Sequence, residues 1–293
     1  MSFKKVIVFG ATGAVGGAAA LEAHKRGAQV YLAMRDTKKP TPTLPDSLQR
    51  VQADLSDPAS VEKAVKETGA TAAFIYVIHG ADMKPAAEAL KEAGIQHVVL
   101  LSSYTVFPDR KAALNNGFIS KMHAEAEFAL EGAGVKHTDI RPMYFTSNVW
   151  QSKGMMKSGE VFYYNPDSVD DYIAPEDIGS VAGVKLLSDE AEIIPLTGPK
   201  LVSKADAWKI TREELGLDFK ITAVPAEQYI ASLAQAGFPA AIAQDLVTII
   251  DRPAATKYPD HLYKAGSTNV KKYTGKEPMG LQDWLKKHKK DIE

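Results

Sequence analysis

A glycine-rich turn directly after a short apolar run is the feature that most constrains the fold of this chain. Residues 5–17 read KVIVFGATGAVGG, so the four apolar residues 6–9 come immediately before the first glycine. An unbroken run of β-branched and aromatic residues is typical of a strand that is buried on both faces of a parallel sheet. Residues 18–25, after the turn, are rich in helix formers. The order of strand, glycine turn and helix predicts a dinucleotide-binding site.

The glycines of this turn have separate roles in that prediction. Gly10 permits the sharp turn out of the strand, and Gly13 lets backbone N–H groups approach a pyrophosphate. Gly16 or Gly17 lets the helix pack close to the sheet, and the helix N-terminus then faces the phosphates with partial positive charge. The spacing is G-x-x-G-x-x-G, whereas most NAD dehydrogenases have G-x-G-x-x-G, and the plain alternative is an ordinary strand-to-helix turn. The residues of the turn that we expect to contact the cofactor are Gly10, Thr12, Gly13, Ala14, Val15 and Gly16.

Length and composition favour a protein that acts on a small molecule. A chain of 293 residues suits one large α/β domain with a smaller appendage. Its 35 basic and 36 acidic residues give no electrostatic footprint for nucleic acid or an anionic membrane. Cysteine is absent, which excludes disulfides, thiolate nucleophiles and cysteine-based metal sites, and no metal site is predicted. We expect a cytoplasmic monomer or homodimer, because no segment approaches the roughly 18 apolar residues of a membrane span and none resembles a secretory signal.

Five further segments predict the other strands of a parallel sheet. These strands are expected at residues 29–34, 48–53, 72–78, 96–101 and 136–142, and two of the helices between them at 83–93 and 118–133. Five strand–helix units followed by a sixth strand predict an α/β fold with a Rossmann-type, doubly wound parallel sheet.

After residue 148 the pattern loosens. Residues 151–160 are mixed in character and are expected to be flexible. Helices are predicted at 175–187, 204–215, 226–249 and 280–290, and strands at 193–197 and 221–224. We therefore predict an NADP(H)-binding Rossmann domain at 1–148 and a smaller, mostly helical substrate-binding part at 149–293, of which residues 170–200 return to the Rossmann core.

The residues after the second strand indicate which cofactor is bound. In a doubly wound fold this strand ends beside the adenosine ribose, where an acid prefers the free 2′-OH of NAD and an arginine accommodates the 2′-phosphate of NADP. Arg35 stands there, with Lys38 and Lys39 close behind it, and these residues favour NADP(H). Asp36 is adjacent and leaves NAD open.

Two acids follow the third strand. Asp54, with Leu55 after it, lies at a strand end in the expected crevice, and its carboxylate is placed to accept a hydrogen bond from the adenine amine. Asp57 precedes Pro58 and is predicted to cap the next helix.

Hydroxyl groups follow the fifth strand, at Ser102, Ser103 and Tyr104. Ligands of open α/β sheets bind outside the carboxyl ends of the strands, so these groups are expected near the nicotinamide. Tyr104 is a candidate proton donor or a wall of the pocket.

Taken together, these segments resemble the atypical short-chain dehydrogenases and, more narrowly, the NmrA-like family. Residues 127–148, EFALEGAGVKHTDIRPMYFTSN, carry that family's run E-x-x-(L/I)-x-x-x-G-(V/I)-x-x-T-x-(L/I)-R-x-x-x-(F/Y)-x-x-N. The family includes NADPH-dependent quinone oxidoreductases, isoflavone-reductase-like enzymes and NADP(H)-sensing regulators. The resemblance implies that Pro142, Tyr144 and Phe145 pack beside the nicotinamide and that Asn148 anchors the loop that follows.

The catalytic pair of orthodox short-chain dehydrogenases is missing. Those enzymes use Tyr-x-x-x-Lys, and the residue four before Lys121 is Gly117. The resemblance instead implies a role for His123, four residues before Glu127, where related branches carry a lysine or a histidine. As an imidazolium, His123 would donate a hydrogen bond or proton to a carbonyl oxygen or to the nicotinamide amide. Lys121 lies about 200° around the helix from it, so we expect one of the two to face solvent.

The sequence thus predicts an NADPH-dependent oxidoreductase with His123, Lys121 and Tyr104 as the catalytic candidates. Its expected substrate is small and hydrophobic, an aromatic or conjugated carbonyl, quinone or imine. Two alternatives remain. One is a non-catalytic NADP(H)-sensing regulator of NmrA type that contacts a protein partner, and the other is a redox-neutral enzyme on the same scaffold.

Overall fold

The computed structural model describes residues 4–292, which divide into two compact units. The first unit contains the chain up to Pro142 together with Pro175–Leu196 and Asn269–Lys276. The second contains Met143–Ala174, Thr197–Thr268 and the chain from Glu277 onward. Each unit is described separately below.

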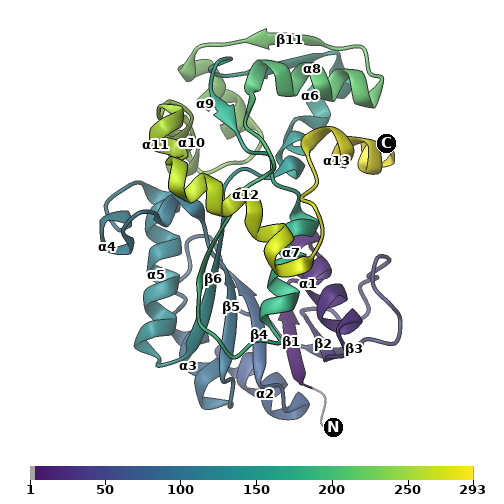
Figure 1. The fold of residues 1–293 in the computed structure, drawn as a ribbon, viewed down its shortest axis with the longest axis vertical. Coiled ribbons are helices and arrows are strands. Elements are labelled where there is room, and N and C mark those ends of the chain that lie inside the picture. The colour runs from purple at the N-terminus through teal and green to yellow at the C-terminus, as the bar shows by residue number, and fades with distance from the viewer. Residues whose placement is uncertain (1–3, 293) are drawn as a thin grey trace. The chain divides into compact units, whose positions relative to one another are not determined.

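A seven-stranded parallel sheet forms the centre of the first unit, with strand order β3-β2-β1-β4-β5-β6-β9 (Figure 1). Its strands are β1 (Lys5–Phe9), β2 (Gln29–Met34), β3 (Gln49–Gln52), β4 (Ala72–Tyr76), β5 (His97–Leu101), β6 (Lys136–Pro142) and β9 (Ile193–Leu196). The order reverses between β1 and β4, and ligands of open sheets bind at such a reversal, beyond the carboxyl ends of the strands.

Helices cover both faces of this sheet (Figure 1). On one face α1 packs against α7, and on the other α3 lies between α2 and α5. Their bounds are α1 (Ala14–Lys25), α2 (Pro58–Thr68), α3 (Lys84–Glu92), α4 (Arg110–Ala113), α5 (Phe118–Gly132) and α7 (Pro175–Lys185), with the 3-10 turn η1 at Tyr104–Val106. Alternate residues of β1 pack against the helices on the two faces of the sheet. Ile7 lies in the core beneath α2, α3 and α5, and Val6 and Val8 are fully buried on the opposite face.

The second unit is mostly helical. Its elements are η2 (Thr146–Ser152), α6 (Lys153–Ser158), β7 (Glu160–Tyr163), β8 (Val169–Asp170), β10 (Val202–Ser203), α8 (Lys204–Leu215), β11 (Lys220–Ala223), α9 (Ala226–Gln235), α10 (Ala240–Ile250), α11 (Ala254–Lys257), α12 (Asp260–Thr274), α13 (Leu281–His288) and η3 (Lys289–Ile292), the end of α12 belonging to the first unit. Strands β7 and β11 pair in parallel, and β8 and β10 antiparallel. One core cluster contains Val161, Phe219, Trp284 and Leu285.

The predicted Rossmann-type sheet and the helical C-terminal part are confirmed, and several element bounds are corrected. The helix after the glycine turn begins at Ala14, and the fourth strand ends at Tyr76 instead of residue 78. Most of residues 151–160, expected to be flexible, lie in η2 and α6. The single helix expected at 226–249 is two helices, because Gly237 adopts a φ of +88° and Pro239 follows.

The structure also differs from the predicted division of the chain. The first segment of the first unit ends at Pro142, before the expected boundary at 148. Backbone hydrogen bonds explain the difference, because the Tyr144 carbonyl accepts from the Ile173 amide and the Thr146 amide donates to the Ile173 carbonyl, both within the second unit. Of the segment 170–200, residues 175–196 lie in the first unit.

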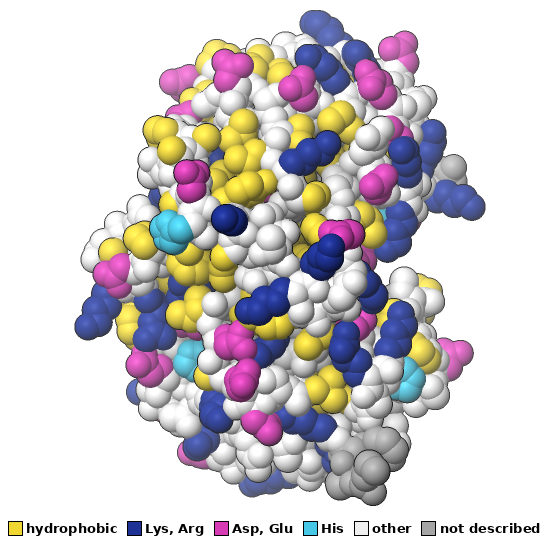
Figure 2. Space-filling model, viewed as in Figure 1, with side chains coloured by type: hydrophobic (Ala, Val, Ile, Leu, Met, Phe, Trp, Pro, Cys, Tyr) yellow, Lys and Arg dark blue, Asp and Glu magenta, His cyan; other side chains and the backbone are white. Residues whose placement is uncertain are grey.

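Charges of both signs are interspersed over the face drawn in Figure 2. This mixture accords with the formal net charge of −1. Among the described residues, none of the helices combines the length and apolar character that crossing a membrane requires.

Candidate functional site

The glycine turn between β1 and α1 has the geometry that a pyrophosphate needs. Gly10 has a φ of +71°, which side chains of L residues rarely adopt. A Cβ atom on Gly16 would lie 2.4 Å from the carbonyl oxygen of Gly10, so only glycine fits where the helix crosses the strand end. Gly13 precedes the helix and contributes no side-chain cap, which leaves the first amides of α1 to a ligand.

A pocket of about 440 Å³ lies beside this turn, within the first unit. Five of the predicted cofactor residues line it, namely Gly10, Thr12, Arg35, Asp54 and Leu55. The other residues that line it are Phe9, Ala11, Ala33, Met34, Asp36, Lys39, Ala53 and Tyr76. These residues come from the carboxyl ends of β1, β2, β3 and β4 and the segments after them, so the pocket occupies the position where dinucleotide folds hold adenosine.

The predicted residues Gly13, Ala14, Val15 and Gly16 do not line this pocket. Gly13 and Ala14 are exposed at the start of α1, and Val15 and Gly16 are buried beneath it. In the structure, therefore, Gly13 and Ala14 are exposed at the start of α1, whereas Val15 and Gly16 pack against the rest of the protein.

Three charged side chains that line the pocket differ in whether they already form hydrogen bonds within the protein. The Oδ1 atom of Asp36 accepts a hydrogen bond of 2.9 Å from the Lys38 amide, so this carboxylate holds its own turn. Oδ1 of Asp54 accepts from the amide and hydroxyl of Ser56 at 3.0 and 2.7 Å. These bonds, together with the charge of Arg35, lower the pKa of Asp54. Arg35 is exposed at the pocket.

Tyr76 was not predicted as a site residue. It is 37% exposed at the end of β4, and its ring lies so close to Gly10 that a Cβ there would approach Cε1 to 2.8 Å. Its position at a strand end was the available signal, which the longer predicted strand, 72–78, concealed.

The hydroxyls after β5 are engaged within the protein. Ser102 is buried and donates to Oε1 of Glu127 at 2.6 Å. Ser103 caps the turn η1, where its Oγ accepts from the Thr105 amide at 3.2 Å. Tyr104 is 3% exposed and meets the Phe107 ring edge-on, at 5.2 Å between centroids. This position suits a wall more readily than a proton donor that reaches into solvent.

Helix α5 carries the two remaining catalytic candidates on different faces. Lys121 is exposed and lies 3.8 Å from the carboxylate of Glu125. His123 is half-buried, and its Nδ1 lies 2.8 Å from the carbonyl oxygen of Ile119. The expectation that one of the two faces solvent is confirmed, and it is Lys121.

His123 is not an imidazolium near neutral pH. Burial lowers its pKa to about 4, and the nearby His79 acts in the same direction. A carbonyl oxygen only accepts, so Nδ1 carries the proton and Nε2 offers a lone pair. The low pKa thus favours a neutral ring that accepts at Nε2 over the cationic donor expected from the sequence.

Glu127 of α5 and Arg141 of β6 form a buried ion pair to which no role was assigned from the sequence. Glu127 is fully buried and accepts from Nε and Nη2 of Arg141 at 2.9 and 2.6 Å. With its bond from Ser102, this carboxylate ties α5 to the ends of β5 and β6. An arginine near the carboxyl end of a predicted central strand was the available signal, since a buried charge needs a partner.

Pro142 is buried at the end of β6, and Tyr144 and Phe145 begin the second unit. The Tyr144 amide donates to Oδ1 of Asp171 at 3.0 Å, and its ring meets Tyr172 edge-on at 5.1 Å between centroids. Nζ of Lys204 lies over the Tyr144 ring at 4.5 Å. The second unit thus presents tyrosine rings with a lysine beside them.

The acids Asp170 and Asp171 hold this arrangement. Asp170 accepts from Nζ of Lys204 at 2.7 Å and from Nζ of Lys257 at 2.9 Å. Asp171 accepts from the Tyr258 hydroxyl at 2.8 Å, and burial raises the pKa of Asp171 to about 6. Among residues 4–292 there is no group of three or more His, Asp or Glu side chains suited to a metal ion.

Comparisons with known proteins show that the chain belongs to an NAD(P)H-binding family. A family model described as NAD(P)H-binding covers residues 10–188, which include the glycine turn, Arg35 and Asp54. The chain is 35% identical to the nitrogen metabolite regulation-like protein bik4 of Gibberella fujikuroi, over 97% of this chain and 96% of that protein. It is 26% identical to a (4-alkanoyl-5-oxo-2,5-dihydrofuran-3-yl)methyl phosphate reductase of Streptomyces griseus, over 97% of each chain.

A solved structure has the same fold. The NADPH-dependent quinone oxidoreductase of Escherichia coli, in complex with NADPH, aligns with a TM-score of 0.76 at 17% identity. The alignment covers 96% of this chain and 98% of that one.

Proposed function

We propose that this chain is an NADPH-dependent reductase, because it belongs to the NAD(P)H-binding family and, within that family, to the NmrA-like proteins. Its proposed acceptor is small and hydrophobic, with an aromatic or conjugated carbonyl, quinone or imine group. The pocket in which Gly10, Arg35 and Asp54 converge carries this proposal.

The residues of the first unit fit such a cofactor. The uncapped amides of α1 suit a pyrophosphate, and Gly16 lets this helix lie close to the strand end, where a Cβ would be 2.4 Å from a backbone oxygen. Arg35 would pair with the 2′-phosphate and Asp54 would accept from the adenine amine. When bound, the nicotinamide supplies a hydride.

We assign His123 the role of orienting the bound molecules. Its Nε2 lone pair accepts a hydrogen bond from an N–H or O–H group, and its Nδ1–H bond to Ile119 fixes the ring. Lys121 is the weaker candidate because its side chain faces solvent beside Glu125. Tyr104 serves as a buried wall in this proposal.

The second unit contains an aromatic cluster of a kind that binds planar molecules. The rings of Tyr144 and Tyr172 provide apolar area, and Phe145 follows in the same segment. The Lys204 ammonium beside Tyr144 is buried and paired with Asp170 at 2.7 Å, so we assign it no role toward the acceptor. The two reductases described above are named for a quinone and for a (4-alkanoyl-5-oxo-2,5-dihydrofuran-3-yl)methyl phosphate, and these names support an acceptor with a conjugated carbonyl group.

The test combines cofactor binding with turnover. Purified protein is titrated with NADPH and NADH, and NADPH oxidation is then followed by absorbance against benzoquinones, azo dyes, enones and aromatic imines. The proposal predicts tighter binding of NADPH than of NADH and turnover of at least one acceptor. Binding without turnover across the panel contradicts the reductase, and failure to bind either cofactor contradicts the assignment of the pocket.

A second candidate function is an NADP(H) sensor that acts through a protein partner. The 35% identical relative, which carries a regulatory name, favours it. A sensor would bind NADPH without turnover and would distinguish the oxidised from the reduced cofactor. Binding constants for NADP⁺ and NADPH, measured with the same protein, separate the two functions.

A further inference from the structure

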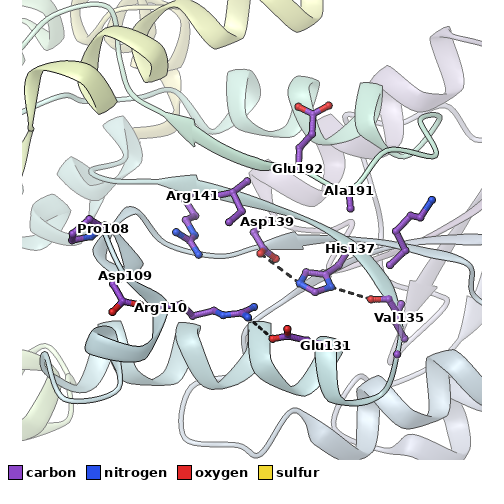
Figure 3. A pocket seen from close by; sticks show the side chains of 13 residues that line it. Pro108, Asp109, Arg110, Glu131, Val135, His137, Asp139, Arg141, Ala191 and Glu192 are labelled. Atoms are coloured by element: carbon purple, nitrogen blue, oxygen red, sulfur yellow. Dashed lines mark hydrogen bonds and ion pairs between the residues drawn. The ribbon is translucent and has the colours of Figure 1, made fainter.

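The first unit contains a second cavity, of about 570 Å³, on one face of β6 near the edge strand β9 (Figure 3). It is bounded by β6, by the C-terminal half of α5, by residues 108–110 and by the segment 191–193. It shares no lining residue with the pocket beside the glycine turn. The proposed reductase function therefore leaves this cavity without a role.

Alternate residues of β6 face the cavity, and the central one is an acid. Asp139 is 2% exposed, and its Oδ1 atom has no hydrogen-bond partner among the described residues. Its Oδ2 atom lies 3.6 Å from Nε2 of His137, toward which it points in Figure 3. The Nδ1 atom of His137 lies 3.0 Å from the Val135 carbonyl oxygen. One oxygen of a buried carboxyl group therefore lacks a hydrogen-bond donor among the described residues.

The other charged side chains around the cavity are already engaged. Arg141 pairs with Glu127, Arg110 with Glu131 and Glu192 with Lys185, while Lys136 donates to the Asp189 carbonyl and Asp109 accepts from the Lys111 amide. Asp139 is thus the acid that lacks a strong partner.

These surroundings set the charge of Asp139. Burial raises its pKa to about 8, and the carboxylates of Glu127 and Glu131 act in the same direction. The guanidinium groups of Arg141 and Arg110 act against them. Without a ligand the group is mostly protonated at neutral pH, and a cation placed on Oδ1 would favour its ionised form.

We propose that this cavity binds a small organic amine or amidine, with its protonated nitrogen on Oδ1 of Asp139. The carbon body of the ligand would lie against Val135 and Ile193, which also line the cavity. The volume lies in the range of small-molecule sites. A cationic N–H donor satisfies the unpartnered oxygen and supplies the counter-charge of the carboxylate that forms when Asp139 loses its proton on binding.

Isothermal titration calorimetry with benzamidine and benzylamine tests the proposal. Benzamide, a neutral molecule of almost the same shape as benzamidine, and benzoate are the matched ligands. The proposal expects saturable binding of at least one cation, with benzamide and benzoate at least about tenfold weaker. Absence of saturable binding by both cations up to millimolar concentration overturns it, and so does equal binding of benzamide.

Two variants locate the binding. Asp139→Asn is isosteric with the protonated acid, so it should fold normally, as a thermal melt will check, and should weaken cation binding at least about tenfold. Asp109→Asn removes a carboxylate at the rim but keeps an efficient helix cap, so it should leave the affinity within about twofold. Equal losses in the two variants would reveal unspecific attraction of cations and overturn the proposal.

The pH dependence provides an independent readout. Because binding ionises Asp139, the affinity for benzamidine should rise by up to about tenfold per unit as the pH approaches 8 and should level off above it. Calorimetry in two buffers of different ionisation enthalpy should record proton release on binding at pH 7. An affinity that is independent of pH, with no proton released, contradicts the contact with Asp139.

Discussion

At the residue scale, the choice of cofactor depends on which charged groups of the nucleotide pocket remain available. Asp36 uses its carboxylate on the Lys38 amide, and Asp54 uses one oxygen on Ser56. Arg35 is exposed and faces the same pocket. The pocket therefore offers a guanidinium where the ribose phosphate of NADP would lie.

Replacing this guanidinium should change the cofactor preference. Arg35→Ala should weaken NADPH binding by about tenfold to a hundredfold, since a charge-assisted contact to phosphate contributes roughly 1.5–3 kcal/mol. NADH binding should change little. Dissociation constants for both cofactors, measured by fluorescence titration, check this. Lys38→Ala is the comparison: the sequence grouped this exposed lysine with Arg35, but Lys38 does not line the pocket, so its replacement should weaken NADPH binding less. Equal losses for NADPH and NADH would instead place Arg35 outside the phosphate contact.

His123 allows a test that separates positioning from structure. Asn at this position keeps a donor for the Ile119 carbonyl but lacks the acceptor that Nε2 provides. His123→Asn should lower kcat/KM for any acceptor that is turned over by about tenfold, with unchanged stability. Steady-state kinetics and thermal melts check both expectations, with Lys121→Ala on the exposed face as the control.

The pH profile adds a second criterion for His123. With its pKa near 4, the neutral ring persists above about pH 5, so activity should show no inflection from His123 between pH 5.5 and 8. An inflection near pH 6.5 that disappears in His123→Asn would show that the ring titrates normally and acts as a cation.

At the scale of elements, the contact between α1 and α7 depends on two glycines. A Cβ on Gly179 would lie 2.4 Å from the Val15 carbonyl oxygen, and one on Gly183 would lie 2.7 Å from that of Ala19. Because backbone atoms are the obstacles, a side chain would have to push the helices apart. The nucleotide-binding helix is thus held in place by small residues of a helix far away in the sequence.

Gly179→Ala should therefore destabilise the protein in spite of the better helix propensity of alanine. We expect a loss of about 2 kcal/mol in the free energy of unfolding. Gly132→Ala is the control, because this glycine is the last residue of α5 and a Cβ there would meet nothing within 4 Å. Urea denaturation of both variants makes the measurement, and equal stabilities would contradict the close packing.

Elements whose cause is local could be predicted from the sequence. The runs at 29–34 and 136–142 form strands with the predicted bounds, and Asp57 caps α2 by accepting from the Ala59 amide at 3.2 Å. The break in 226–249 was also local, at Gly237 and Pro239, and amphipathic periodicity on either side concealed it.

Features that arise only when distant segments meet could not be predicted. Gly179 is an ordinary helix residue in the sequence, and its function appears only where Val15 packs against it. The same holds for the charge states of His123 and Asp139, since burial, which depends on the folded chain, is the largest cause of both pKa shifts. From residue type alone, both side chains would be expected to have the pKa values that they have in an unfolded chain.

At the scale of the whole molecule, buried ionisable groups make stability depend on pH with opposite signs. His97 is 1% exposed, and burial lowers its pKa from 6.5 to about 4. Between these values the unfolded chain binds more protons, so His97 makes the free energy of unfolding fall as the pH falls. Asp139 has its pKa raised from 3.8 to about 8, so in that window the folded chain binds more protons. It makes stability fall as the pH rises.

Differences between variants and the wild type isolate these two effects. Relative to the wild type, Asp139→Asn should gain stability as the pH rises from 4 to 8, by about 1 kcal/mol per unit at the steepest point. His97→Gln should gain relative stability as the pH falls from 6.5 to 4, whatever constant amount it loses in packing. Urea denaturation followed by circular dichroism at several pH values measures both slopes.

The signs of the two slopes are the decisive result, because a packing defect changes stability by the same amount at every pH. A constant difference between Asp139→Asn and the wild type from pH 4 to 8 would mean that Asp139 ionises as it does in the unfolded chain. The carboxyl group would then already have a counter-charge or water beside it, and the cavity on β6 would lose the unpaired acid on which amine binding depends. A rising difference would establish that folding alone leaves this acid without a partner.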